Sequence, residues 1–497
     1  MIIQSCNQTP HPEICNSIIP TRHLHKKKKT QLGFRHSLLQ AALDWAIWEH
    51  RLASLVEIPS LDLESRVAWA DCMELSVDTI KLLNRSLLST NPKSFHDVQT
   101  WLSAAVANQR TCRDGFSELN RSPPSFPSSF ASSLLPELLV NSLAANKAAI
   151  SSRVLIRGRG HQLPPKRYPP WISRGDRKLL GRLNIAWKAD VVVAKDGLGN
   201  YSTISEAVAA SKMQMSGDKR FVIFVKAGIY DENVEIDSEM RNVMFIGEGM
   251  DYTVVTGNRS VQDGLMTTFR TATFTVAGEG FMARDMTFQN TAGPQKHQAV
   301  ALRSSSDRSI FYRCSFKGYQ DTLYLHSQRQ FYHHCRIYGT VDFIFGDAAA
   351  ILHSCDIYVR RPMIFQANIV TAQGRSDPNE NTGIAIQDSR VEATPELLRV
   401  QGSFNTYLGR PWGEHSRTVF MKTHLGGLIH PAGWVGWVGD FGLRTLFFGE
   451  YMNTGHGART GSRVRWPGRV VMNASQAEEF TPTRLLHGDG WIRAAGF

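Results

Sequence analysis

Residues 330–339 read "QFYHHCRIYG", and closely similar stretches lie on either side: "SIFYRCSFKG" begins at 309 and "AILHSCDIYV" at 350. Each stretch has an apolar run, a polar step and a second apolar pair. The matching cysteines, spaced by 21 and 20 residues, are Cys314, Cys335 and Cys355. A period of this length in β-type sequence predicts a solenoid, most directly a parallel β-helix.

A fourth stretch, "FMARDMTFQN" at 281, extends the repeat upstream and would place Asp285 at the position of the cysteines. The alternative fold is an irregular β-sandwich. A sandwich is not expected to return similar residues at a fixed period, so the repeat favours the β-helix.

Asp321 and Asp342 each lie in a run of aromatic and aliphatic residues, and they are 21 residues apart. That separation equals the local period, and stacked coils are about 4.8 Å apart. We therefore expect the two carboxyl groups on adjacent coils, close together and facing the same way. Gln298, which lies 23 residues before Asp321, should come from the preceding coil and complete a short column on one face.

Two carboxyl groups at such a distance cannot both ionise cheaply, so one tends to stay protonated while the other is charged. That division suits an acid and a nucleophile. Two aspartates that cap turns or form ion pairs could have the same spacing, so the spacing alone leaves both interpretations open.

The first 150 residues have a helical pattern. In "LLQAALDWAIWEHRL" (38–52) one face carries Leu39, Leu43, Ala46 and His50, and in "ADCMELSVDTIKLL" (70–83) one face carries Ala70, Met73, Val77 and Ile80. Similar patterns recur near "WLSAAVANQ" and "LLVNSLAANKAAI", with polar connections between them. Residues 1–150 therefore predict an all-α helical bundle.

The composition changes at about residue 151. Residues 151–189 are rich in Arg, Pro and Gly and have no apolar period, which predicts an exposed linker. Short β-type runs begin after Asp190. We therefore expect a helical domain at 1–150, a linker at 151–189 and an all-β domain at 190–497.

The chain has 497 residues, of which 42% are hydrophobic and 20% charged, as in an ordinary globular protein. Its net charge of +12 favours a polyanionic partner, although a basic solvated surface would have the same composition. No helix-turn-helix, finger or RNA-recognition pattern supports nucleic acid, and an acidic polysaccharide fits the charge as well.

Nothing in the composition points to a membrane protein. No apolar run reaches the roughly 18 residues that a membrane helix needs. The opening "MIIQSCNQTPHPEIC" lacks the basic-then-apolar start of a signal peptide. Sequons that would permit glycosylation of a secreted chain occur at Asn7, Asn84, Asn120, Asn200, Asn258 and Asn473.

Five motifs follow one another in the β-type part: "GIYDE" (228–232), "QAVALR" (298–303), "GYQDTLY" (318–324), "GTVDFIFG" (339–346) and "YLGRPWG" (407–413). Together they resemble the motif set of plant pectinesterases, also called pectin methylesterases. The resemblance covers roughly residues 190–497. It implies a right-handed parallel β-helix that removes methyl esters from homogalacturonan, with methyl-esterified pectin and water as its substrates and the plant cell wall as its location.

The resemblance also implies a role for individual residues. Asp342 corresponds to the nucleophile and Asp321 to the general acid and base, while Gln298 and Gln320 correspond to the groups that stabilise the oxyanion. The substrate-binding positions are Thr268, Gln298, Arg410 and Trp412. A nearby cation favours an ionised carboxylate, so we expect Arg410 to keep Asp342 charged. The chemistry needs no metal, and no cofactor is expected.

The N-terminal part resembles the pectinesterase-inhibitor domain, a four-helix bundle. "CNQTPHPEIC" (6–15) is similar to its opening motif, and Cys72 and Cys112 match its second cysteine pair. The resemblance therefore implies the bonds Cys6–Cys15 and Cys72–Cys112. The repeat predicts a third bond, Cys335–Cys355, because the same position on adjacent coils lies within disulfide range, and it leaves Cys314 over.

Between the two resemblances, "RKLL" (177–180) is similar to the basic processing motif that plant pectinesterases carry at this junction. We expect a processing protease to cut here, so that the helical domain serves before then as an inhibitor or as a pro-region for folding and export. A permanent tether is the alternative. Separate proteinaceous pectinesterase inhibitors are further expected partners.

The rival functions are another enzyme on the same polymer, either a lyase or a glycosidase, and a binding protein. A lyase on the same polymer would want an acidic calcium cluster, and an inverting glycosidase would have carboxyl groups about 6.5–9.5 Å apart. A binding protein could carry an inactive relic of the enzyme. The complete set of Gln298, Gln320, Asp321, Asp342 and Arg410 argues against the relic.

Overall fold

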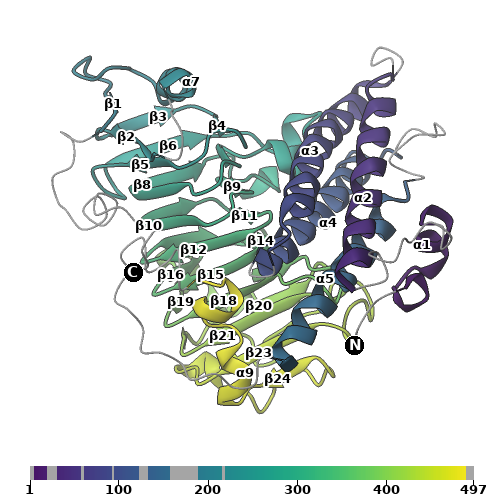
Figure 1. Cartoon of the computed structure of the whole chain (residues 1–497). Helices are drawn as coiled ribbons and strands as arrows, with labels where there is room; N and C mark the ends of the chain where they lie inside the picture. The colour runs from purple at the N-terminus through teal and green to yellow at the C-terminus, as the bar shows by residue number, and fades with distance from the viewer. Residues whose placement is uncertain are drawn as a thin grey trace. The chain divides into compact units, whose positions relative to one another are not determined.

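The computed structural model describes residues 5–19, 31–56, 61–91, 94–122, 133–156, 189–214 and 219–488. The chain forms two compact units, built mainly from residues 1–165 and 166–497 (Figure 1). The first unit is helical and the second is a parallel β-helix, so the predicted fold class is confirmed. The expected processing motif at 177–180 lies outside the described residues.

The helical unit is a four-helix bundle preceded by a short hairpin. Its long helices are α2 (Gln31–Ala53), α3 (Leu63–Leu88), α4 (Phe95–Glu118) and α5 (Leu135–Ile156). Helix α2 packs against α3 and α5, and α4 packs against the same two helices, which closes the bundle. Because α5 continues to Ile156, the last helix extends past the predicted end of the domain at residue 150.

One helix face is as predicted and another is not. In α2 the predicted residues Leu39, Leu43 and Ala46 are buried. In α3, however, Val77 is 38% exposed, whereas Leu75 and Leu82 are buried. The buried face of α3 also includes Thr79, whose hydroxyl accepts a hydrogen bond from the Asn108 amide of α4 at 3.2 Å. The predicted buried face of α3 is therefore wrong, because the pattern assigned polar residues such as Thr79 to the solvent-exposed side.

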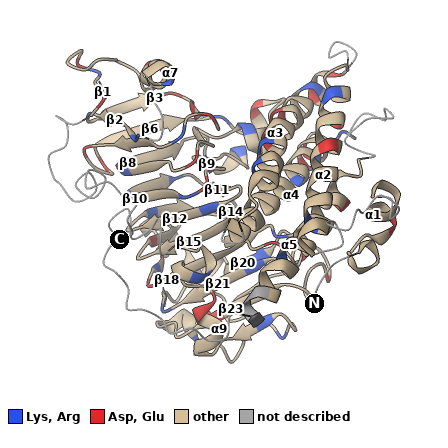
Figure 2. Cartoon of the chain, viewed as in Figure 1, with Lys and Arg blue, Asp and Glu red and all other residues tan. Residues whose placement is uncertain are grey.

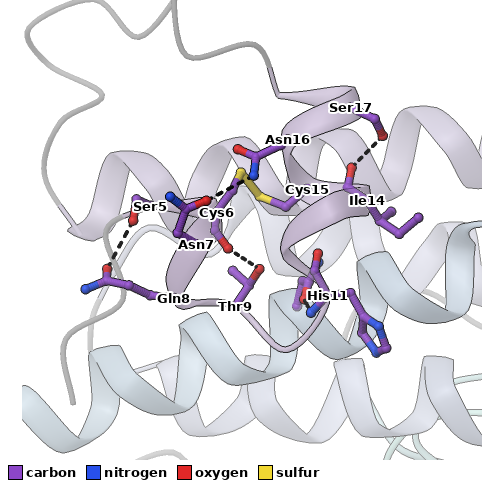
Figure 3. The surroundings of a disulfide bond; sticks show 11 residues. Ser5, Cys6, Asn7, Gln8, Thr9, His11, Ile14, Cys15, Asn16 and Ser17 are labelled. Carbon is purple, nitrogen blue, oxygen red and sulfur yellow. Dashed lines mark hydrogen bonds between the residues drawn. A yellow bond between two sulfur atoms is a disulfide. The ribbon is translucent and has the colours of Figure 1, made fainter.

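The hairpin before the bundle consists of η1 (Cys6–Gln8) and α1 (Pro12–Ile18), joined by the Cys6–Cys15 disulfide with a Cα–Cα distance of 5.3 Å (Figure 3). The buried Asn141 of α5 fixes it to the bundle. Its amide donates to the His11 carbonyl at 2.9 Å, and its carbonyl accepts from the His11 backbone N–H at 2.9 Å. The hairpin is therefore a part of the helical unit.

The second expected disulfide of this unit, Cys72–Cys112, is also present and joins α3 to α4. The two cysteines are 40 residues apart along the chain. In the chain-entropy model, closing a loop of that length stabilises the folded state by about 4 kcal/mol.

The β unit has three parallel ladders. The first contains β1 (Val191–Val193), β2 (Phe221–Val225), β5 (Val243–Ile246), β12 (Arg329–His333), β15 (Ala349–His353), β18 (Gly383–Gln387), β21 (Arg417–Met421), β23 (Phe447–Tyr451) and β24 (Arg469–Val471). The second contains β3 (Gly228–Asp231), β6 (Thr253–Gly257), β13 (Arg336–Gly339), β16 (Asp356–Val359), β19 (Arg390–Ala393) and β22 (His424–Leu425). The long strands β8 (Met282–Asn290) and β10 (Ser309–Lys317) contribute one half to each of these ladders.

The third ladder is a separate sheet whose strands contain or directly follow four of the five motifs: "QAVALR", "GYQDTLY", "GTVDFIFG" and "YLGRPWG". Its strands are β4 (Val234–Ile236), β7 (Phe274–Val276), β9 (Leu302–Ser304), β11 (Leu323–Leu325), β14 (Ile344–Gly346), β17 (Asn368–Gln373) and β20 (Thr406–Pro411). In the middle of the stack each coil has one segment in each ladder, and the inward side chains of all three ladders form one apolar core. Figure 1 shows the coils stacked from β1 to β24.

The bend that follows the first ladder is the same in every coil from β8 to β23. One residue at each bend has a positive φ: Asp285, Arg313, His334, Ser354, Asp388, Lys422 and Met452. The strand register aligns these residues with one another. A non-glycine residue in this region costs about 1 kcal/mol or more, so the stacked neighbours must hold each bend.

The register of the strands shows that the predicted alignment of the fourth repeat with the other three is wrong by one residue. Asp285 lies beside Arg313, and the residue in register with Cys314 is Met286. The three cysteines do occupy one inward position on successive coils, as the repeat predicted. The fourth repeat was therefore predicted in the right part of the chain, but Met286 rather than Asp285 occupies the position of the cysteines.

The predicted bond between Cys335 and Cys355 is wrong, because both cysteines and Cys314 are free and buried. Side chains in register on parallel strands point the same way, which keeps their Cβ atoms near the strand spacing of about 4.8 Å. A disulfide needs about 3.8 Å between Cβ atoms. The Cys335 thiol instead donates to the Phe311 carbonyl at 3.3 Å.

Additional helices pack against the coil stack. Near the first coils, α7 (Ile204–Gln214) adds Ile204 and Val208 to the core. The Glu232 carboxylate of the "GIYDE" motif accepts from the backbone N–H groups of Ile204 and Ser205 at 2.9 and 2.8 Å, so this acid caps α7. After β24 in the chain, α9 (Ala474–Glu478) and α10 (Pro482–Leu485) cover apolar residues on the outer face of the first ladder, and α10 contacts β15.

Charged residues are scattered over the helices and the coils in the view of Figure 2, with Asp and Glu among the Lys and Arg.

None of the helices in the described part of the chain combines the length and the apolar character that a membrane crossing demands.

We predict that Glu49→Gln stabilises the helical unit increasingly as the pH rises. Glu49 of α2 is 2% exposed, and burial raises its pKa to about 7, although the Ser133 hydroxyl donates to it at 2.9 Å. Because the pKa of Glu49 is raised in the folded state, the contribution of this residue to the free energy of unfolding is fully present below about pH 4.5. That contribution is lost as the pH rises through about 7. Glutamine does not titrate, so the variant should gain up to roughly 3 kcal/mol at pH 8.

Thermal unfolding of the full chain, followed by helical circular dichroism between pH 5 and 8, measures this difference. Asp44→Asn is the matched control, because Asp44 is exposed on the same helix. A difference between Glu49→Gln and the parent that stays constant with pH would contradict the prediction.

Candidate active site

The two aspartates occupy equivalent positions on adjacent coils of the third ladder. Strand β11 pairs with β14 so that Leu323 lies beside Ile344, and each aspartate is two residues before its strand. Asp321 has a φ of 61° and Asp342 a φ of 50°, and they are 7% and 5% exposed. The 21-residue period therefore brings the two carboxyl groups to neighbouring turns, as expected.

Backbone hydrogen bonds tie these two turns together. The Asp321 N–H donates to the Val341 carbonyl at 3.0 Å, and the Thr340 N–H donates to the Tyr319 carbonyl at 2.9 Å. Gln320 lies between these contacts and is partly exposed. The turn that carries Gln320 and Asp321 is thus fixed to the turn that carries Asp342.

Arg410 binds Asp342 through two hydrogen bonds. Its Nε donates to Oδ1 at 2.8 Å, and its Nη2 donates to Oδ2. Arg410 belongs to β20, where the register places it beside Ala372, and Ala372 lies beside Phe345 of β14. A planar guanidinium that binds both oxygens fixes the orientation of the carboxylate.

The electrostatic balance at Asp342 differs from the expectation. Burial raises the pKa of the Asp342 carboxyl, and the hydrogen bonds and charge of Arg410 lower it by less, so the net shift is upward. The pKa of Arg410 is also raised: burial alone would lower it, and the hydrogen bonds and charge of Asp342 outweigh that effect. Arg410 therefore limits the cost of ionising a buried carboxyl group rather than lowering its pKa below the ordinary range.

The two remaining polar positions lie on earlier coils. Gln298 precedes β9, the coil before Asp321, as predicted. Val300, however, is the residue in register with Asp321, so Gln298 lies two residues upstream of the expected column. Thr268 begins the short helix η8 (Thr268–Arg270), which precedes β7, one coil earlier still.

Trp412 extends a row of outward aromatic side chains on the third ladder. Tyr324 and Phe345 lie side by side in register and stack with their ring centroids 4.3 Å apart. The Trp412 ring centroid is 6.4 Å from that of Tyr324 and 5.9 Å from that of Phe345. Tyr324 and Phe345 are only 4% and 5% exposed, whereas Trp412 is partly exposed.

The sequence reasoning missed Trp437. The Cζ atom of Arg410 lies 4.3 Å from the centroid of the Trp437 ring, so the guanidinium is held between an aromatic face and the Asp342 carboxylate. Trp437 lies in "GWVGWVGD" (433–440), a glycine-rich stretch that has no strand pattern and no repeat. The sequence therefore contains no signal that Trp437 contacts Arg410.

We predict that Arg410→Gln destabilises the protein more as the pH rises. A raised carboxyl pKa means that stability is present at low pH and is lost as the pH rises through the folded-state pKa. Without the guanidinium that pKa rises further, and at neutral pH a buried carboxylate loses its partner at a cost of up to about 3 kcal/mol.

The measurement is thermal unfolding of the full chain from pH 4 to 8. In an Asp342→Asn background the same Arg410→Gln change removes no ion pair, so its effect should not depend on pH. An equal pH dependence in both backgrounds would contradict the electrostatic coupling.

Comparison with known proteins places the chain in a family. The pectinesterase model matches residues 190–489, and the model of the plant invertase and pectin methylesterase inhibitor matches residues 1–145. Probable pectinesterase/pectinesterase inhibitor 6 of Arabidopsis thaliana is 49% identical over 99% of this chain and 93% of its own length. Pectinesterase 2 of Citrus sinensis is 45% identical over 98% and 92%.

Among solved structures, pectin methylesterase from carrot matches with a TM-score of 0.61 and 55% identity, covering 62% of this chain and 96% of the carrot chain. The β-helix, the ordered motifs and the full-length relatives agree with one another. The chain belongs to the pectinesterase family of carboxylic ester hydrolases and carries an N-terminal domain of the pectinesterase-inhibitor type.

Proposed function

We propose that this pectinesterase hydrolyses the methyl esters of homogalacturonan through a covalent acyl-enzyme on Asp342. The observation that carries the proposal is the carboxylate of Asp342, bound at both oxygens by Arg410 and placed one coil away from Asp321. Each oxygen of a carboxylate has two lone pairs, so binding by Arg410 leaves one available for attack.

In the first step an Asp342 oxygen attacks the ester carbonyl carbon, and negative charge moves to the carbonyl oxygen. The side-chain amides of Gln298 and Gln320 would donate hydrogen bonds to that oxyanion, each worth about 3–4 kcal/mol in the transition state. Asp321, protonated, gives its proton to the departing methoxide. The products of this step are methanol and an acid anhydride between Asp342 and the galacturonate.

In the second step Asp321 is the base. It takes a proton from a water molecule, whose oxygen attacks the carbonyl carbon of the acyl-enzyme. The bond to the Asp342 oxygen breaks, which returns Asp342 to its ionised form and leaves Asp321 protonated for the next cycle. The galacturonic acid product then loses its carboxyl proton to solvent. The proposed chemistry uses only side chains and water.

We predict that Asp342→Asn lowers methanol release from methyl-esterified pectin by at least about 10³-fold, because an amide is a poor nucleophile. The protein should stay folded, since asparagine has nearly the same shape and tolerates a positive φ. Asp388→Asn is the matched control, because Asp388 is an exposed aspartate with a φ of 46° at a bend of the β-helix.

The assay should follow methanol and polymer length together. Methanol without shorter chains identifies an esterase, whereas cleavage of the polymer would identify a lyase or a glycosidase. Retention of most of the methanol release by Asp342→Asn would rule out Asp342 as the nucleophile.

We further propose that the helical unit restrains or chaperones the enzyme until a protease cuts the linker at 177–180. The match of residues 1–145 to the inhibitor family supports this role. The match to carrot pectin methylesterase supports a β-helix that folds independently of the helical unit. The match covers 96% of the carrot chain but 62% of this chain, which is about the share that residues 190–497 make up.

The predicted product of cleavage starts just after Leu180, and N-terminal sequencing of the protein recovered from cell walls tests it. Replacing Arg177 and Lys178 with alanine should leave the chain intact. The same change at Lys166 and Arg167, a second basic pair in the linker, should not. Recovery of an intact parent chain with full activity would show that the linker is a permanent tether.

We propose secretion to the cell wall, where the polymer is found. Two disulfides in the helical unit are typical of proteins from oxidising compartments. All the asparagines of the sequons are exposed and so accessible to glycosylation: Asn7, Asn84, Asn120, Asn200, Asn258 and Asn473.

A further inference from the structure

Arg360 reaches the turn that carries Gln320 and Asp321 from a different coil. It follows β16, in the coil after that of Asp342. Its Nη1 donates to the Gly318 carbonyl at 3.0 Å, and its Nη2 donates to the Tyr319 hydroxyl at 2.6 Å. Its Cζ atom also lies 3.8 Å from the centroid of the Tyr319 ring. One guanidinium therefore holds the backbone and the side chain just before Gln320.

The backbone of Arg360 is attached to the other catalytic turn. Its N–H donates to the Gly339 carbonyl at 2.8 Å, three residues before Asp342. The Nε atom of Arg360 lies 3.5 Å from Oε1 of Glu396, whose side chain is 46% exposed. Arg360 thus connects the turn of Asp321 with the segment that leads into the turn of Asp342.

The turn of Asp321 needs such support. Asp321 has a φ of 61°, a conformation that costs a non-glycine residue about 1 kcal/mol or more. On one side the turn is tightly packed, because a Cβ atom at Gly318 would lie 2.7 Å from the Thr322 hydroxyl. Arg360, which follows β16, contacts Gly318 and Tyr319. It therefore restricts movement of the turn that the contact with Thr322 does not prevent.

We infer that Arg360 is a positioning residue for the ester hydrolysis: it holds the Gly318–Tyr319 backbone so that Gln320 and Asp321 keep their place relative to Asp342. The inference rests on the proposed function, because it assigns these residues their catalytic roles. Arg360 itself contacts neither carboxyl group through any of these bonds. Its effect should therefore appear in turnover rather than in substrate affinity.

The test is steady-state methanol release by the full chain carrying Arg360→Ala. A catalytic turn displaced by a fraction of an ångström should lower kcat by about 10- to 100-fold and change KM by less than about threefold. Ethylguanidinium added at millimolar concentration should restore part of kcat, because it can refill the site and make both hydrogen bonds. Ethylammonium, which has no planar fork, should restore less.

Arg390→Ala is the matched control. Arg390 also bonds a tyrosine hydroxyl, Tyr358 at 3.4 Å, and pairs with Asp356 at 3.2 Å on the second ladder, away from the catalytic turns. Its kcat should equal that of the parent. Tyr319→Phe keeps the ring under Arg360 and removes one hydrogen bond, so it should lower kcat by a few-fold without loss of folding.

An unchanged kcat in Arg360→Ala would overturn the inference. So would a loss of activity that equals the loss of folded protein and is not restored by ethylguanidinium, because that result describes a purely structural arginine. If Arg360→Ala does not fold, Arg360→Lys and Tyr319→Phe provide the same comparison of kcat and KM. A parent chain that releases no methanol would refute the proposed function instead.

Discussion

Parallel strands in neighbouring coils exchange backbone hydrogen bonds at one spacing, so the place of a residue within its coil fixes its neighbours one coil away. The site depends on this constraint. Pairing of Leu323 with Ile344 sets Asp321 beside the turn of Asp342, and pairing of Ala372 with Arg410 brings the guanidinium to the same face. The carboxylates and the guanidinium are therefore placed by regular backbone rather than by long loops.

The same constraint explains how much the sequence could reveal. Around the aspartates the coils are short and nearly equal, so the cysteine positions repeat after 21 and 20 residues. Farther along, Ile351 pairs with Ala385, 34 residues later, because a loop is inserted into the coil. The period therefore predicted the aspartate pair, whereas Arg410, beyond the inserted loops, could be found only from its motif.

Other features depend on side-chain direction, which a period does not contain. Cys335 and Cys355 lie on adjacent coils, but parallel Cβ vectors keep their sulfur atoms from bonding. Val77 was assigned to the wrong face of α3 because a polar residue, Thr79, has its partner inside the bundle. Trp437 and Arg360 act through contacts with other side chains, and neither lies in a repeated pattern.

The environment of Asp342 combines two opposing requirements. A carboxylate that has lost hydration is a stronger nucleophile, yet burial also favours its protonated form. The bidentate Arg410 stabilises the ionised form without restoring water to it. The Trp437 ring on the guanidinium shields the pair further, so the charge of Asp342 is balanced mainly by a single fixed cation.

The position of Arg410 in the chain has a consequence for synthesis on the ribosome. The arginine that completes the pair with Asp342 is 68 residues farther along, and it reaches the site only after β17 and then β20 have been added to the stack. The helical unit is translated first, and domains generally fold in that order. The helical bundle can therefore fold well before Arg410 is able to pair with Asp342, and a chain stalled before residue 410 has both aspartates without that cation.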